Sequence, residues 1–323
     1  MRWMLGVLLM AAALAPAPAR AQGEDAAVTI AGPSGELGGV MRRAGEGAPL
    51  LLIIPGSGPT DHNGDNRLGV RGGPYRRLAE ALAAQGVSSV RIDKRGMFSS
   101  AAGAADPNAV TVDDYAADVR AWTAALRARE HVRCVWVLGH SEGGLVALAA
   151  APSDANLCGL ILLAAPGRKF GDVLRAQLAA NPANAPLMED AMRALDAFEH
   201  GRRIDVSAMH PALQGLFNPR VQGFLISLAS ADPVALLAHY AGPTLVVQGA
   251  NDVQISPADD ADKLAHAREG VDYAPIPGMN HVLRIVPDGD RAANLASYAD
   301  ANAPIAPALA PAIARFIAGH PAQ

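Results

Sequence analysis

Short apolar runs recur along the chain and alternate with stretches of helical periodicity. Strands are predicted at 28–30, 39–42, 50–54, 87–92, 134–138, 159–164, 244–248 and 271–276. Most of these runs lack polar alternation, which is typical of strands buried on both faces. Helices are predicted between them at 75–85, 112–129, 143–150, 258–267 and 308–318. This alternation predicts an α/β fold with a mostly parallel sheet that helices cover on both faces.

The pattern changes between residues 167 and 239. Helical patches follow one another there without an intervening strand, at 171–180, 187–199, 211–217 and 221–230, and prolines separate them. We interpret 167–239 as a helical cap inserted into one core domain, which residues 22–166 and 240–323 form together.

The first 21 residues have the pattern of a secretory signal peptide. Arg2 gives a positive start, Trp3 to Ala15 is apolar, and Ala19-Arg20-Ala21 offers a cleavage site of small residues. Because the apolar run is too short to span a bilayer as a helix, we expect cleavage near Ala21. The mature protein would then be periplasmic or secreted, without stable membrane insertion. A retained membrane anchor is the alternative.

Charge changes this picture little. The formal net charge is −4 over 323 residues, and no cluster of Lys or Arg stands out. These features argue against a nucleic-acid partner. No set of Cys and His has the spacing of a metal site.

The two cysteines, Cys134 and Cys158, each open a predicted strand, and the two strands follow one another along the chain. In a parallel sheet, both could lie at the same edge. Since an exported protein can keep a disulfide, we hypothesise a Cys134–Cys158 bond. Two buried free thiols are the alternative.

Candidate chemistry begins at Gly139-His140-Ser141-Glu142-Gly143, which follows the apolar run 135–138 and precedes the helix that ends at Ala150. A strand, G-x-S-x-G and a helix in that order form the nucleophile-elbow pattern, which exposes a serine hydroxyl above the sheet. A chance match in a chain rich in alanine and glycine is the alternative.

A serine nucleophile needs a base and an acid that orients the base. Asp252 follows the predicted strand 244–248, and His281 follows the predicted strand 271–276. Ser141, Asp252 and His281 therefore occur in the chain order of an α/β-hydrolase triad. Asp252 as a turn-capping residue is the alternative to its role as the acid.

The negative oxygen of a tetrahedral intermediate needs hydrogen-bond donors. The backbone N–H of Glu142, directly after the nucleophile, is one candidate. The second is the N–H of Ser57, in the loop that begins Pro55-Gly56-Ser57 after a buried strand.

Several segments together resemble the α/β-hydrolase superfamily, and within it the bacterial esterases and serine-aminopeptidase-like hydrolases. The matching segments are 54–61, 93–96, 139–144, 249–252 and 278–281. The resemblance implies a mostly parallel sheet, a triad of Ser141, His281 and Asp252, and no organic cofactor. Two positions depart from the family pattern: Pro55 replaces its usual histidine, and Phe98 replaces a glycine.

The remaining candidates surround this site. His62, Phe98 and His140 are candidate substrate contacts. Asp93 and Arg95 are interpreted as bracing their loop through a buried or half-buried ion pair. The polar run 60–66 lacks the spacing of an EF-hand, so we expect it to line the rim of the site.

The sequence thus predicts a serine hydrolase, a carboxylesterase that cleaves small-molecule esters of small to medium acyl groups. An aminopeptidase or amidase with the same triad is the first alternative, with Glu142 or Glu189 holding a substrate ammonium. A non-catalytic exported binding protein on the same fold is the second.

Overall fold

The computed structural model describes residues 23–321; the predicted signal peptide, residues 1–21, lies outside the described residues. An eight-stranded sheet with the order β1-β2-β4-β3-β5-β6-β7-β8 forms its centre. The strands are β1 (Asp25–Ala31), β2 (Glu36–Arg42), β3 (Leu50–Ile54), β4 (Ser88–Ile92), β5 (Val135–His140), β6 (Leu157–Leu163), β7 (Thr244–Gly249) and β8 (Val271–Ile276). Only the pairs β1–β2 and β2–β4 are antiparallel. The predicted α/β fold with a mostly parallel sheet is confirmed.

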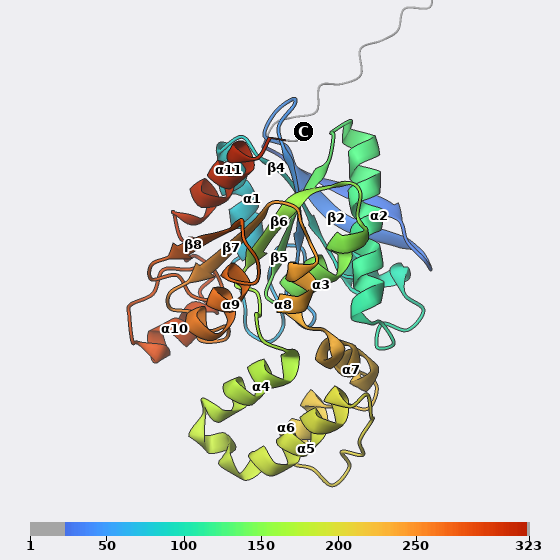
Figure 1. The fold of residues 1–323 in the computed structure, drawn as a ribbon, viewed down its shortest axis with the longest axis vertical. Coiled ribbons are helices and arrows are strands. Elements are labelled where there is room, and N and C mark those ends of the chain that lie inside the picture. Colours follow the sequence, from blue (N-terminus) through green and yellow to red (C-terminus); the bar gives the residue numbers. More distant parts are fainter. Residues whose placement is uncertain (1–22, 322–323) are drawn as a thin grey trace, which may run out of the picture.

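Helices cover both faces of this sheet (Figure 1). One face carries α1 (Pro74–Ala84) and α11 (Leu309–Gly319), and the other carries α2 (Val112–Glu130), α3 (Glu142–Ala150), α8 (Pro233–Ala238) and α9 (Asp262–Ala265). Strand β3 shows why its sequence is continuously apolar. Leu50 and Leu52 join the cluster under α2 and α3, whereas Leu51 and Ile53 join the cluster under α1 and α11. Alternate side chains therefore fill two separate apolar layers.

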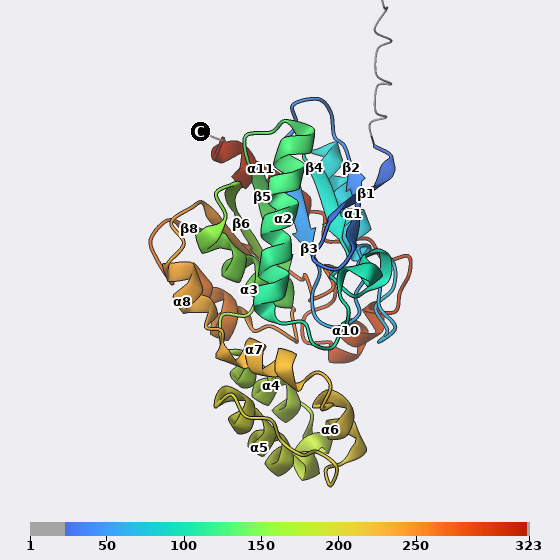
Figure 2. The same cartoon turned by 90° about the vertical axis from the view of Figure 1, so that its right-hand side faces the viewer.

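The cap projects from one end of the core (Figures 1 and 2). Its helices are α4 (Phe170–Ala179), α5 (Met188–Glu199), α6 (Pro211–Leu216) and α7 (Gln222–Ser230). They enclose an apolar cluster, in which the rings of Phe198 and Phe217 lie 5.5 Å apart, and Val112 of α2 and Leu145 of α3 join this cluster from the core. The predicted cap boundary at 239 includes α8, but Leu237 of α8 belongs to the apolar layer of the core. Contacts therefore assign α8 to the layer that covers the sheet.

The largest departure from the predicted elements is α10 (Arg291–Ser297), which no periodic pattern indicated. Asn294 is the only buried residue of this short helix, and side-chain hydrogen bonds attach the helix to the loop after β8. There Asn280 Nδ2 donates to Asn294 Oδ1 at 3.2 Å and to Ser297 Oγ at 2.8 Å.

Within residues 23–321, no helix is both long and apolar enough to cross a membrane.

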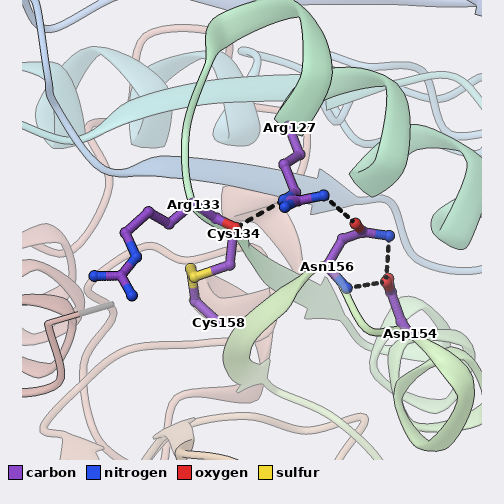
Figure 3. The surroundings of a disulfide bond; sticks show 6 residues. All are labelled: Arg127, Arg133, Cys134, Asp154, Asn156 and Cys158. Carbon is purple, nitrogen blue, oxygen red and sulfur yellow. Dashed lines mark hydrogen bonds between the residues drawn. A yellow bond between two sulfur atoms is a disulfide. The ribbon is translucent and has the colours of Figure 1, made fainter. Parts of the chain in front are cut away.

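The predicted disulfide is present. Cys134 and Cys158 are bonded with their Cα atoms 5.1 Å apart, at the amino ends of neighbouring strands β5 and β6. Figure 3 shows the polar contacts beside the bond. Arg127 Nε donates to the carbonyl of Arg133 at 2.9 Å, and the Asn156 N–H donates to Asp154 at 2.9 Å.

Candidate active site

Ser141 lies on the sharp turn between β5 and α3, with φ 54° and ψ −124°. Such a positive φ is strained for a residue with a side chain. Close backbone packing on both sides holds the turn: a Cβ added to Gly139 would collide with Gly143, and one added to Gly143 would collide with the backbone of β3. The G-x-S-x-G pattern thus forms the strand–turn–helix geometry of a nucleophile elbow.

Asp252 and His281 come together from the ends of β7 and β8. His281 Nδ1 lies 2.8 Å from Asp252 Oδ2, and both side chains are buried. The other oxygen of Asp252, Oδ1, accepts the N–H groups of Gln254 at 2.8 Å and Ile255 at 3.0 Å. The two interpretations of Asp252 therefore coexist, because one oxygen caps the turn and the other faces the histidine.

Asp252 is held as a carboxylate. Burial by itself raises the pKa of this group, but the nearby charge and hydrogen bond of His281 and the backbone N–H groups lower it further, so its pKa lies below the ordinary value. A carboxylate on Nδ1 fixes the ring of His281 and leaves Nε2 for proton transfer.

Ser141 and His281 line the same cavity, whose volume is about 100 Å³. Its wall comes from the loop after β3, the start of α1, the elbow and the loops after β7 and β8. The lining residues are Gly56, Ser57, Thr60, Gly64, Asn66, Val70, Pro74, Tyr75, His140, Ser141, Gln254, His281, Val282 and Leu283. Of the segment 60–66, which was predicted to line the rim, Thr60, Gly64 and Asn66 line the cavity. Cap residues are not among those that line this cavity.

A hydrogen-bonded chain connects three parts of that wall. The Gly56 N–H donates to Tyr75 Oη at 3.1 Å, and Tyr75 Oη lies 2.8 Å from His140 Nδ1. His140 Nε2 lies 2.9 Å from the carbonyl oxygen of His281. Because a carbonyl can only accept, Nε2 carries the proton, and Nδ1 accepts the hydroxyl proton of Tyr75.

Both nitrogens of His140 are thus occupied, which leaves only its carbon edge for the substrate contact predicted from the sequence. Burial and the nearby charge of His281 lower the pKa of His140 to about 3. The ring is therefore neutral at physiological pH and can act as a fixed link between the loops.

A second link lies beneath the cavity. Lys94 Nζ donates to the carbonyl of Gly56 and to Glu142 Oε1, both at 2.9 Å. Lys94 and Glu142 are both buried. Glu142 is therefore paired and unavailable to a substrate ammonium, while Glu189 lies exposed on α5 of the cap.

The other candidate contacts lie outside the cavity wall. His62 is held at the end of β4, where its N–H donates to Asp93 Oδ1 at 2.7 Å and its Nδ1 lies 3.0 Å from Asp93 Oδ2. Phe98 is 47 % exposed, at the start of a short 3-10 helix. Neither residue lines this cavity, so their proposed contact with substrate gains no support here.

Asp93 and Arg95 brace their loop, but through different partners. Asp93 holds His62 and the hydroxyl and N–H of Ser99. Arg95 pairs with Asp114 at 3.1 Å and with Asp118 on α2. The predicted ion pair of Asp93 with Arg95 is therefore replaced by two others, since Arg95 pairs with carboxylates of α2 and Asp93 contacts His62.

Two parts of the site were missed by the sequence analysis. Tyr75 and Lys94 carried no motif that separates them from ordinary helix and loop residues, although Lys94 lies inside the segment 93–96 that resembles the family.

No metal centre was predicted from the sequence. Residues 23–321 contain no group of three or more His, Cys, Asp or Glu side chains arranged to hold an ion.

Comparison with known proteins places this geometry in a family. Residues 66–285 match the family described as serine aminopeptidase, S33. Among curated proteins, no sequence matches significantly.

Solved structures share the fold at low sequence identity. Est1E from Butyrivibrio proteoclasticus has a TM-score of 0.57 and 16% identity, over 92% of this chain and 99% of its own. The Pyrococcus furiosus esterase PF2001 has a TM-score of 0.58 and 14% identity, over 92% and 91%. A proline iminopeptidase of Mycobacterium smegmatis has a TM-score of 0.57 and 18% identity, over 91% and 98%.

These neighbours share the sheet and its helical layers, and the family match spans most of the chain, including the elbow and Asp252 and His281. The chain therefore belongs to the serine aminopeptidase S33 family of α/β hydrolases.

Proposed function

We propose that this hydrolase cleaves small carboxylic esters through an acyl-enzyme on Ser141. The observation that carries the proposal is the meeting of Ser141 and the Asp252-bound His281 at one small cavity. A serine on a strained elbow, a histidine fixed by a carboxylate and free backbone donors form the set that acyl transfer needs.

In the proposed reaction, Ser141 Oγ bonds to the acyl carbon while its proton moves to Nε2 of His281. The π electrons of the carbonyl move to its oxygen, which the N–H groups of Ser57 and Glu142 stabilise. The oxyanion then collapses, the C–O bond to the alcohol breaks, and the alcohol leaves with the proton from His281. Water repeats these steps on the acyl-enzyme, and the carboxylic acid and free Ser141 result.

The cavity wall favours a short, uncharged acyl group. The cavity has a volume of about 100 Å³, which is below the roughly 300–1,000 Å³ of pockets for drug-sized ligands. Among the described residues that line it, none is Asp or Glu. An aminopeptidase needs a group that holds the substrate ammonium, so the wall supports an ester over an N-terminal amine.

The test is hydrolysis of p-nitrophenyl esters from acetate to palmitate, beside proline p-nitroanilide. We expect acetate or butyrate to give the highest kcat/KM, and Ser141→Ala to lower kcat at least about 10³-fold, because the nucleophile is lost. Asp262→Asn on α9 is the matched surface control. Faster cleavage of the anilide would favour the aminopeptidase instead.

The non-catalytic alternative is tested by labelling with a fluorophosphonate probe. We expect the parent protein to be labelled at Ser141 and the Ser141→Ala variant to stay unlabelled. A folded parent that neither reacts with the probe nor cleaves any ester would contradict the proposed function.

A further inference from the structure

We propose that Lys94, through its buried contacts with Gly56 and Glu142, orients the Ser57 oxyanion donor, balances the carboxylate beside the Glu142 donor, and is a positioning residue for catalysis. The inference rests on the proposed function, since it concerns the same site. It assigns a task to a buried lysine that does not line the cavity.

The ammonium of Lys94 donates hydrogen bonds to the loops on either side. Its Nζ donates to Gly56 O and to Glu142 Oε1 at 2.9 Å each, and it lies 5.4 Å from the centre of the Tyr115 ring. Lys94 is 4% exposed and Glu142 is 7% exposed. A buried lysine is costly unless paired, so this arrangement fixes the ammonium at one place.

The contact with Gly56 sets the direction of the Ser57 N–H. A peptide group is planar and trans, so its N–H points opposite to its carbonyl. Since Gly56 O points to Lys94, the N–H of Ser57 points away from Lys94, and Ser57 lines the cavity that also holds Ser141. Within residues 23–321, the N–H of Ser57 has no hydrogen-bond acceptor, so it is free to bind an oxyanion.

The opposite side of Gly56 is also held, because its own N–H donates to Tyr75 Oη. Lys94 and Tyr75 therefore fix the two peptide groups that flank one glycine. A loop without a side chain at that position is otherwise free to rotate, and the Ser57 N–H would lose its direction.

The contact with Glu142 joins the second donor to the same ammonium. Glu142 begins α3 directly after Ser141, and its N–H is the other predicted oxyanion donor. Its buried carboxylate would repel a developing oxyanion, and the positive charge of Lys94 offsets that repulsion. One lysine thus connects the ends of β3 and β5 and balances the charge beneath the reacting carbon.

The experiment compares Lys94→Met and the double variant Lys94→Met/Glu142→Gln with the parent. The double variant removes the unpaired carboxylate, so it keeps the test valid if the single variant folds poorly. We expect kcat for phenyl acetate to fall about 10²-fold in both, the effect of losing one oxyanion donor, while KM changes less than about threefold.

A second readout separates positioning from general damage. 1,1,1-Trifluoroacetone adds to a serine hydroxyl as a tetrahedral oxyanion, so its Ki should rise by about the factor that kcat falls. Arg43→Met/Glu130→Gln is the matched control, because Arg43 and Glu130 form a part-buried pair at 2.8 Å near the amino end of β4, at the opposite end of the strands from the site. Its kcat should stay within about twofold of the parent.

The outcomes separate the inference from the function on which it rests. An active parent with folded Lys94 variants of unchanged kcat and Ki overturns the inference alone. Recovery of kcat in the double variant reduces Lys94 to a counter-ion and also overturns the orienting role. A parent that hydrolyses no ester overturns the proposed function and the inference with it.

Discussion

At the scale of single residues, His140 shows how a titratable group serves as a structural link. Its pKa is lowered to about 3 by burial and by the charge of His281, whereas an unfolded histidine titrates near 6.5. Between these values the unfolded chain binds a proton that the folded chain does not. The free energy of unfolding therefore rises with pH through this window. The contribution of the neutral His140 is complete above about pH 6.5 and is lost progressively as the pH falls toward 3.

We expect His140→Gln to flatten this dependence. Between pH 6.5 and 4.5 the parent should lose about 2–3 kcal/mol more unfolding free energy than the variant, since each pH unit contributes about 1.4 kcal/mol for one proton. Urea unfolding at pH 7.0, 5.5 and 4.5 measures both slopes. Equal slopes in the two proteins would show that His140 titrates normally.

At the scale of elements, the two ends of the parallel strands have separate tasks. Ser141, Asp252 and His281 follow the carboxyl ends of β5, β7 and β8, whereas the disulfide joins the amino ends of β5 and β6. The bond suits the oxidising compartment that the signal pattern predicts, and localisation itself stays a prediction.

We expect Cys134→Ala/Cys158→Ala to lower the free energy of unfolding by about 3 kcal/mol, because the unfolded chain regains the freedom of a closed loop of 24 residues. The kcat should stay within about twofold, since the site lies at the other end of the strands. Urea unfolding with and without reductant measures the effect. The double variant is the control, because reductant should leave it unchanged.

At the scale of the whole molecule, the cap holds an apolar cluster that helices of the cap supply in large part, and Val112 of α2 and Leu145 of α3 join it from the core. The cap cluster includes Phe198, which is buried against Phe217, while the residues that line the cavity at Ser141 belong to the core. We infer that the stability of the cap and the chemistry of short esters are only weakly coupled.

Phe198→Ala tests this separation. The loss of a buried ring should lower the free energy of unfolding by about 3–5 kcal/mol, while kcat for phenyl acetate changes less than about twofold. Urea unfolding and steady-state kinetics at low temperature measure both quantities. A parallel fall of kcat would mean that the cap shapes the cavity after all.

The sequence by itself determined the local elements and the order of the chemistry. Apolar runs located the central strands β3, β5, β6 and β7, because a strand buried on both faces is apolar along its length. The elbow was recognisable since its glycines and serine are adjacent in the chain. The capping box of Thr111 and Asp114, which starts α2, is equally local. By contrast, α10 depends on Asn280 and Asn294 across a loop, and its own sequence lacks periodicity.

Only the tertiary structure decided which distant groups meet. Gly56, Tyr75, Lys94, His140 and Glu142 come from four separate segments, and their contacts arise because β3, β4 and β5 are neighbours in the sheet. Neither a buried lysine nor a backbone donor has a signature in the sequence, since both depend on what packs around them. The sequence thus identified the groups predicted to react, and the packing of the loops fixed the directions in which they point.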